Sequence, residues 1–176
     1  MKNQIVQPVV GIDQDTKGLA WFMMDSANFN YLGHGYLTRK KGTKRVPHFP
    51  KQLHSLLDRF LSTGALVYLE DIFCRSKKGY KSLAHAQGEI LFKALEVGYT
   101  HEFPTVLACV WQKKVFSWYN TELEGTTKEK ALVVATELIA PGVVFANEHE
   151  VDAACIAAFA TWKEFHASSK KKTPFG

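Results

Sequence analysis

The chain has 176 residues, of which 46% are hydrophobic and 22% charged, so its composition is that of a globular domain rather than a disordered chain. No linker rich in proline, glycine or serine divides it, and we expect one domain over residues 1–167 and a basic, disordered tail over residues 168–176. The apolar runs are too short to span a bilayer, and no signal peptide begins the chain, which predicts a cytoplasmic protein without a membrane partner. The excess of 22 Lys and Arg over 17 Asp and Glu, a net charge of +5, favours a polyanionic partner.

The first 70 residues predict three adjacent strands, a helix and a fourth strand. Val9–Asp13 is an apolar, β-branched run, and two further strands are expected over residues 19–24 and 29–37, with tight turns between them that imply an antiparallel meander. Apolar residues recur at helical spacing over residues 49–61. The next strand is expected over residues 65–70.

The second half of the chain predicts mainly helices. A loop over residues 72–79 precedes a helix over residues 81–97, and residues 105–110 form another short apolar run that suggests a strand. Three helical segments are expected after it: a short one over residues 111–119, one with its apolar face over residues 131–138 and a cap at Thr126 or Thr127, and one over residues 148–165. This order predicts an α/β domain with a five-stranded mixed sheet, in which the first three strands are antiparallel.

Three acidic residues end or follow buried segments. Asp13 closes the first strand, Glu70 closes the fourth, and Asp152 lies in the alanine-rich segment over residues 151–160. A carboxylate at the end of a central strand is costly to desolvate unless it is paired or binds a cation. Because alanines allow the last helix to approach the sheet closely, we expect Asp152 to lie near Asp13, with Glu70 beside them.

The residues before Asp152 offer a fourth ligand. His149 is three residues away and Glu148 four, so both can share the face of Asp152 on a helix, whereas Glu150 points to roughly the opposite side. Spacing alone leaves His149 and Glu148 as alternatives.

Basic residues gather in several short clusters beside these acids. Phe73 stands among cations and suits either a core position under its loop or a position where an aromatic ring stacks on an unpaired base. The clusters are Arg39–Arg45, Arg75–Lys78, Lys113–Lys114 and Lys170–Lys172. Solvated loops are the alternative explanation for such runs, but their position next to three acids favours nucleic-acid binding.

Several segments taken together are similar to a known family. VVGIDQDTKGLAWF, VYLEDIF, KSLAHAQGE, VWQKKVF and HEVDAACIAAFA, in this order over most of the chain, resemble the RuvC family of Holliday-junction resolvases in the RNase H-like superfamily. The resemblance implies an RNase H-like fold with helices on both faces of the sheet, cleavage of four-way DNA junctions by paired symmetrical nicks, and a homodimer. It implies no nucleotide cofactor.

The resemblance also assigns the metal ligands. Asp13, Glu70 and Asp152 match the catalytic acids of the family, and His149 stands where the family's other C-terminal acid lies. These four residues would hold two divalent ions, Mg²⁺ or Mn²⁺, with Asp13 bridging both. An imidazole ligand would shift preference toward Mn²⁺, and activity would fall as His149 protonates near its ordinary pKa of about 6.5.

The DNA contacts follow from the same comparison. Phe73 matches the aromatic residue that wedges into the junction, and the sequence departs from the family at Gln14–Asp15, where Pro-Gly is usual, and in a shortened spacing over residues 82–87. Asp15 could add charge near the metals. The predicted DNA-binding residues are Phe73, Arg75, Lys77, Lys78, Lys114 and one of Lys128 and Lys130.

Other functions remain compatible with the sequence. An RNase H-like nuclease acting on other branched DNA or on RNA–DNA hybrids would use the same acids, and a non-catalytic junction-binding domain would explain the histidine at position 149. A structural protein with incidental acids is the third alternative. The helix over residues 81–97, with Gly88 and several alanines, is the candidate dimer surface.

Overall fold

The computed structural model describes residues 6–41, 47–72, 76–101, 103–119, 122–167 and 175. Its central feature is a five-stranded sheet in the order β3-β2-β1-β6-β7. The strands are β1 (Pro8–Gln14), β2 (Gly18–Asp25), β3 (Tyr31–Thr38), β6 (Leu66–Glu70) and β7 (Thr105–Val106); β4 (Lys40–Lys41) and β5 (Pro47–His48) form a separate two-stranded ribbon. Strands β1, β2 and β3 are antiparallel neighbours, while β1, β6 and β7 run parallel, which confirms the predicted mixed sheet.

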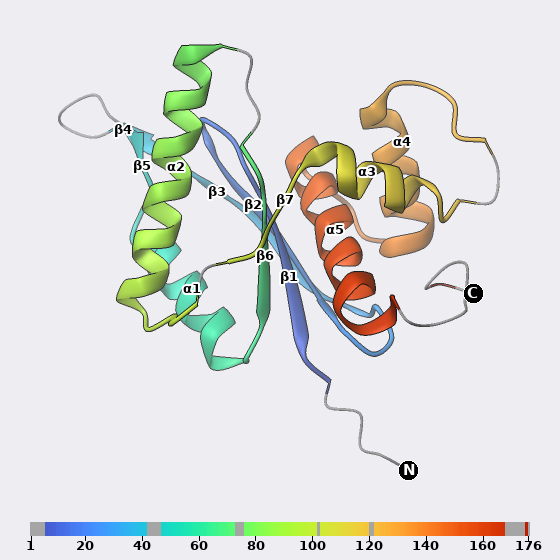
Figure 1. Cartoon of the computed structure of the whole chain (residues 1–176), viewed down its shortest axis with the longest axis horizontal. Coiled ribbons are helices and arrows are strands. Elements are labelled where there is room, and N and C mark those ends of the chain that lie inside the picture. The colour runs from blue at the N-terminus through green and yellow to red at the C-terminus, as the bar shows by residue number, and fades with distance from the viewer. Residues whose placement is uncertain are drawn as a thin grey trace.

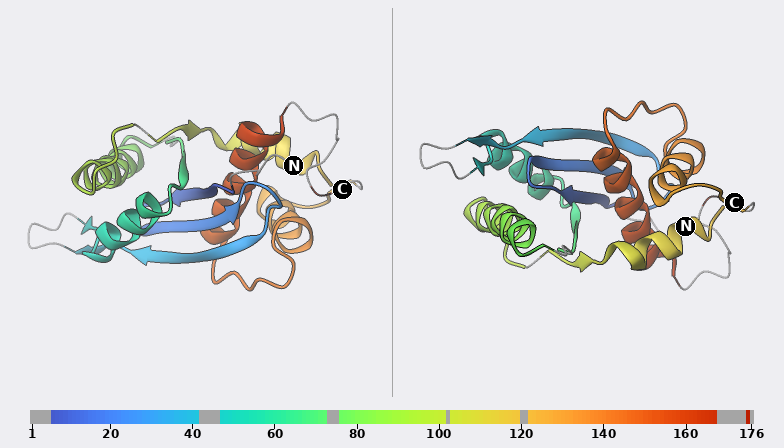
Figure 2. Two further views of the ribbon diagram at one scale, coloured as in Figure 1. Left: turned by 90° about the horizontal axis from the view of Figure 1, so that it is seen from below. Right: turned by 90° about the horizontal axis from the view of Figure 1, so that it is seen from above.

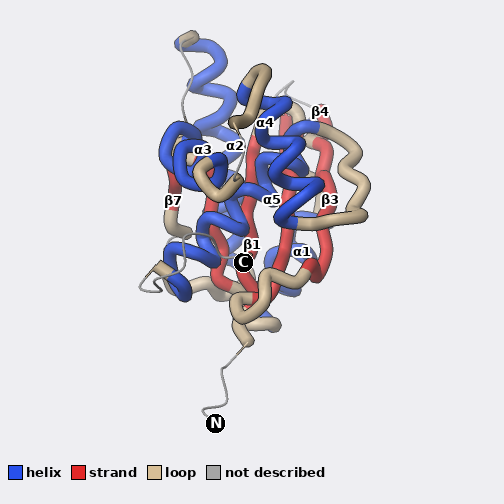
Figure 3. Tube along the Cα trace, turned by 90° about the vertical axis from the view of Figure 1, so that its right-hand side faces the viewer, coloured by secondary structure: helices blue, strands red, loops and turns tan. Residues whose placement is uncertain are grey.

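Helices cover both faces of this sheet, as Figures 1 and 2 show. Helices α1 (Gln52–Ser62) and α2 (Lys77–Glu96) lie on one face. The other face, seen in Figure 3, is covered by α3 (Ala108–Phe116), α4 (Thr127–Val134) and α5 (Glu148–Thr161), and π-helical segments η1 (Ala135–Ile139) and η2 (Trp162–His166) extend α4 and α5. Among the described residues, no helix has the length and apolar character needed to cross a membrane.

Strand β1 supplies side chains to two separate cores because successive residues of a strand point to opposite faces. Val10 and Ile12 pack with the α1 and α2 side, and Val9 packs with the α5 side. Continuing the alternation puts Gly11 and Asp13 on the α5 side as well. The pleat of β1 therefore presents a small residue and then an acid to the same helix.

The contact between β1 and α5 is unusually close at Gly11. A Cβ atom at this position would lie 2.2 Å from the carbonyl oxygen of Ala153 and 2.4 Å from the amide nitrogen of Ala157. Both alanines are fully buried. The alanine-rich helix approaches the sheet as predicted, and it can do so because position 11 has no side chain.

Several predicted boundaries are wrong. The strand expected over residues 105–110 is only Thr105–Val106, because a helix starts at Ala108 and buries Trp111 and Val115, which are four residues apart. Short apolar runs fit a buried helix as well as a strand, so periodicity could not separate the two.

The loop expected over residues 72–79 is also shorter. Helix α2 starts at Lys77, four residues earlier than predicted, because the Ser76 side chain accepts a hydrogen bond from the amide of Gly79 and caps the helix. The third strand starts at Tyr31 instead of residue 29, since Phe29 has a φ of 58° and belongs to the turn. The predicted tail stays a prediction, because residues 168–174 and 176 lie outside the described part.

We predict that Gly11→Ala destabilises the protein by about 1–3 kcal/mol or more, because the new methyl group must push α5 away from β1. For a chain of this size, each kcal/mol lowers the melting temperature by roughly 2–4 °C. Thermal and denaturant unfolding would measure the change.

The matched control is Gly88→Ala, on an exposed part of α2, where an added Cβ would have nothing within 4 Å. Alanine is expected to stabilise that helix by roughly 0.5–1 kcal/mol. Equal effects at the two positions would contradict the close packing described at Gly11.

Candidate active site

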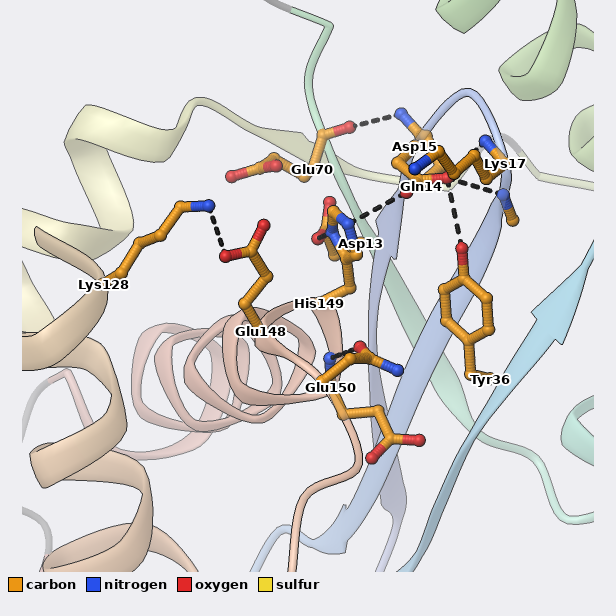
Figure 4. Close-up of polar contacts among 12 residues, drawn as sticks. Asp13, Gln14, Asp15, Lys17, Tyr36, Glu70, Lys128, Glu148, His149 and Glu150 are labelled. Atoms are coloured by element: carbon orange, nitrogen blue, oxygen red, sulfur yellow. Dashed lines mark hydrogen bonds and ion pairs between the residues drawn. The ribbon is translucent and has the colours of Figure 1, made fainter.

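Asp13 is the centre of the candidate site. It lies near the end of β1, between β2 and β6, and is only 3% exposed. Its Oδ2 atom lies 2.6 Å from Nδ1 of His149, at the start of α5 (Figure 4). The close approach of α5 to Gly11 thus delivers the first turn of this helix to the acid at the end of β1.

Glu70 reaches the same edge because β6 runs parallel to β1 and both strands end there. Its Oε1 atom accepts a hydrogen bond of 3.0 Å from the indole Nε1 of Trp111, and its backbone oxygen accepts one of 2.8 Å from Gln14 Nε2. Burial raises the pKa of Glu70 to about 8, and the charge of Asp13 and then of Asp152 adds to this, although the Trp111 hydrogen bond acts in the opposite direction.

Asp152 completes the acidic group from the second turn of α5. Burial, followed by the negative charge of Asp13, raises the pKa of Asp152 to about 7, while the positive charge of His149 opposes the shift. Asp13, Glu70 and Asp152, from three separate elements, are therefore within electrostatic range of one another, as the sequence predicted.

His149 lies between two carboxylates. Its Nδ1 atom lies 2.6 Å from Asp13 Oδ2, and its Nε2 atom lies 2.9 Å from Asp15 Oδ2. The hydrogen bonds to Asp13 and then Asp15 raise the pKa of His149 to about 10, so in the absence of a metal the imidazole is protonated at neutral pH. The expected titration of His149 near pH 6.5 is therefore wrong for this arrangement. The two carboxylate partners raise the pKa, and the sequence did not reveal them.

The alternative ligand Glu148 points elsewhere. It forms an ion pair with Lys128 of α4, and its side chain is about half exposed (Figure 4). Glu150 is buried on another side of the helix, where it accepts a hydrogen bond of 2.7 Å from the amide of Ala146 and lies 3.6 Å from His34 Nε2. Of the three residues before Val151, His149 is the one that contacts Asp13.

The chemistry of the site suits a hard divalent cation. Asp13, Glu70 and Asp152 offer carboxylate oxygens, the ligands that Mg²⁺ prefers, and burial, followed by the charge of Asp13, raises the pKa values of Glu70 and Asp152. Within the described residues, no three His, Cys, Asp or Glu side chains already surround a single point in metal-binding geometry. In this arrangement the imidazolium of His149 supplies the positive charge next to Asp13.

The predicted DNA-binding residues have different surroundings. Lys77 and Lys78 are exposed in the first turn of α2, and Lys128 is exposed but paired with Glu148. The ammonium of the half-buried Lys114 lies 3.9 Å from the ring centroid of Trp162. Lys130 is half-buried in α4, and Phe73 and Arg75 lie outside the described residues.

Arg39 does not belong to a solvated basic loop. Its side chain is buried, and its Nη2 atom lies 2.9 Å from His85 Nδ1 and 3.5 Å from Glu89 Oε2, both on α2. Its position directly after a predicted strand suggested a loop, but its contacts with α2 hold the side chain in the interior.

Sequence reasoning missed several partners of the acids. Trp111 and Gln14 hydrogen-bond to Glu70, and Tyr36 donates a hydrogen bond of 3.3 Å to Asp15. Asp15 was considered only as extra charge, and its contact with His149 was not foreseen. Gln14 is next to Asp13 in sequence, but Trp111 and Tyr36 lie 41 and 21 residues from the acids that they contact, so no local pattern could assign them.

The sheet order, with two antiparallel pairings followed by two parallel ones and helices on both faces, is that of an RNase H-like α/β fold.

Solved structures of RuvC from Thermus thermophilus share this fold. One, in complex with a Holliday junction substrate, has a TM-score of 0.64 and 15% sequence identity, with 91% of this chain and 97% of that chain covered. A second has a TM-score of 0.60 and 17% identity, with 89% and 95% covered. Neither the models of known families nor the curated proteins match the sequence. The chain therefore has a RuvC-like fold, as the sequence predicted.

We predict that Mg²⁺ binding releases protons at neutral pH, because the metal competes with protons for Glu70 and Asp152, whose pKa values are raised to about 8 and about 7. Affinity should rise from about pH 6 upward, by up to roughly tenfold per pH unit for each protonated ligand, and the proton of His149, whose pKa is about 10, adds to those released if His149 binds the metal. Titration calorimetry in buffers of different ionisation enthalpy counts the protons. Glu70→Gln should release fewer of them, and an affinity independent of pH would contradict the prediction.

Proposed function

We propose that this protein is a metal-dependent endonuclease that resolves four-way DNA junctions by paired symmetrical nicks. The observation that carries the proposal is the convergence of Asp13, Glu70 and Asp152 from β1, β6 and α5 at one edge of the sheet. The fold supports it, since a RuvC of the same fold has been solved in complex with a Holliday junction substrate. Mg²⁺ or Mn²⁺ is the proposed cofactor.

In the proposed site, Asp13, Glu70 and Asp152 would hold two divalent ions, and His149 would be a further ligand or would orient the attacking water. Such a pair of ions lowers the pKa of water and offsets the charge that develops on the leaving oxygen of a phosphodiester. The protein's own contribution is to gather the three carboxyl groups at one partly buried edge of the sheet, where burial and the charge of Asp13 raise the pKa values of Glu70 and Asp152. Trp111 fixes Glu70 from one side by its hydrogen bond of 3.0 Å.

Lys128 is the proposed phosphate contact nearest the acids. It stands in the first turn of α4, and its present partner is Glu148 of α5. Because the two side chains are 66% and 48% exposed, their ion pair contributes little to stability, and Lys128 can exchange Glu148 for a phosphate at small cost. Lys77 and Lys78 are the proposed contacts on the other side of the sheet.

A four-way junction has two-fold symmetry, so paired cuts call for a two-fold dimer. Helix α2 is the proposed interface. Phe92 and Leu95 are 59% and 64% exposed, and together with Gly88 they lie on one face of the helix at spacings of three and four residues. A second copy of this chain would cover these side chains.

The first experiment is cleavage of a cruciform plasmid with Mg²⁺ or Mn²⁺. Paired nicks within the lifetime of one complex give linear product, whereas independent nicks give a relaxed circle first. Asp13→Asn should reduce cleavage by more than roughly 100-fold. Losing a residue that only hydrogen-bonds to a metal ligand typically costs about 10- to 100-fold, whereas Asp13 is itself a proposed ligand. Asp25→Asn is the matched control, since Asp25 is also a buried strand aspartate but lies at the far end of β2, where it accepts hydrogen bonds from the amides of Ala27 and Asn28.

Other outcomes select other functions. Equal cleavage of flaps, RNA–DNA hybrids and junctions would indicate a less selective RNase H-like nuclease. Tight junction binding without cleavage in either metal would indicate a non-catalytic binding domain. Cleavage that survives Asp13→Asn would contradict the proposed active site.

The proposed DNA contact of α2 predicts a salt effect. Lys78→Ala should weaken binding similarly for junctions of different sequence and reduce the slope of log affinity against log salt by about 1, as for loss of one phosphate contact. Fluorescence anisotropy over a series of salt concentrations measures this slope. Lys93→Ala, near the other end of the same helix, should leave the slope unchanged, and equal slopes for both variants would contradict the assignment.

A further inference from the structure

Asp15 is held firmly in the turn between β1 and β2. Its Oδ1 atom accepts hydrogen bonds of 2.5 Å from the amide of Lys17 and 2.6 Å from the amide of Gly18. The hydroxyl of Tyr36, on β3, donates to the same oxygen at 3.3 Å. Three donors from two elements thus fix the carboxylate and leave Oδ2 free of these contacts.

This Oδ2 atom meets His149, 2.9 Å from Nε2 (Figure 4). The opposite edge of the ring presents Nδ1 to Asp13 at 2.6 Å. The ring of Tyr36 also stacks on the imidazole, with centroids 6.2 Å apart and an angle of 24° between the planes. The orientation of the imidazole is therefore set by contacts at both edges and on one face.

Tyr36 is itself fixed by the turn. A Cβ atom at Gly18 would lie 2.5 Å from the Tyr36 ring, so the ring packs directly over this glycine. Both oxygens of Asp15 face N–H groups, Oδ1 the amides of Lys17 and Gly18 and Oδ2 the Nε2 atom of His149, so the carboxyl group acts as an acceptor on both sides. An ionised carboxylate accepts hydrogen bonds and cannot donate one.

We propose that Asp15 is the positioning residue for His149: by accepting a hydrogen bond from Nε2–H it fixes the imidazole with Nδ1 facing Asp13, so that the Nδ1 lone pair is available as a ligand once a metal ion displaces the Nδ1 proton. A neutral imidazole carries one proton, and the partner of one nitrogen decides which nitrogen can ligate. The inference rests on the proposed function, since it takes His149 as a ligand. It adds a residue that the resemblance did not assign.

Asp15→Asn tests this assignment because it changes one atom and reverses the hydrogen-bond preference. The amide oxygen can still accept from the Lys17 and Gly18 amides, while the NH₂ group takes the place of Oδ2 and donates to Nε2. The imidazole proton is then displaced to Nδ1, toward Asp13. In this tautomer no lone pair faces the metal.

The experiment compares Asp15→Asn with Asp25→Asn, the same substitution in a turn where Asp25 accepts from the amides of Ala27 and Asn28. Calorimetry should show Mn²⁺ binding weakened roughly 10- to 100-fold by the first substitution and unchanged by the second. ¹⁵N NMR of the Mg²⁺-loaded protein should show the proton of His149 on Nε2 in the wild type and on Nδ1 in Asp15→Asn. Asp15→Ser retains a weaker turn acceptor that does not reach Nε2, and should weaken Mn²⁺ binding even if Asp15→Asn fails to fold.

Two results would overturn the inference. In the first, Asp15→Asn binds Mn²⁺ as tightly as Asp25→Asn and keeps the proton on Nε2. In the second, Mg²⁺ leaves the ¹⁵N signals of His149 in the wild type unchanged, which means that His149 is no ligand, whether or not the protein cleaves DNA. Conversely, the expected spectra from a protein that cleaves no junction would support the role of Asp15 and reject the nuclease proposal.

Discussion

The candidate site depends on the contact between Gly11 of β1 and the backbone of α5. A side chain at position 11 would collide with Ala153 and Ala157, so the helix lies as close to the sheet as backbone atoms permit. The first turn of α5 consequently reaches the end of β1, and the alternation of the strand turns Asp13 toward it two residues later. The packing that stabilises the fold and the geometry that assembles the acids are thus one feature of the molecule.

The electrostatics follow from that packing. Burial and mutual repulsion raise the pKa values of Glu70 and Asp152, and His149 offsets only part of the negative charge. A site of this kind stores unfavourable energy that a divalent cation relieves, which is the physical reason for associating it with metal-dependent chemistry. Trp111 contributes a neutral donor, so it orients Glu70 without cancelling its charge.

Much of this arrangement was predictable because its signals are local. The apolar run ending in Asp13, the parallel strand ending in Glu70 and the alanines around Asp152 indicated both the sheet and the meeting of the acids. The failures have a different origin. Tertiary partners far away in sequence decide three features that no local pattern encodes. These are the helical state of residues 108–110, the burial of Arg39 and the contacts of His149.

His149 and Asp15 are linked in the structure by a contact of 2.9 Å between Nε2 and Oδ2. The imidazole lies between two carboxylates, with Asp13 at its Nδ1 edge and Asp15 at its Nε2 edge. A residue without a side-chain acceptor at position 15 could accept no hydrogen bond from Nε2–H, and the imidazole could then present either nitrogen to Asp13. In the proposed site, the histidine at position 149 and the aspartate at position 15 therefore act together, across the turn that joins β1 to β2.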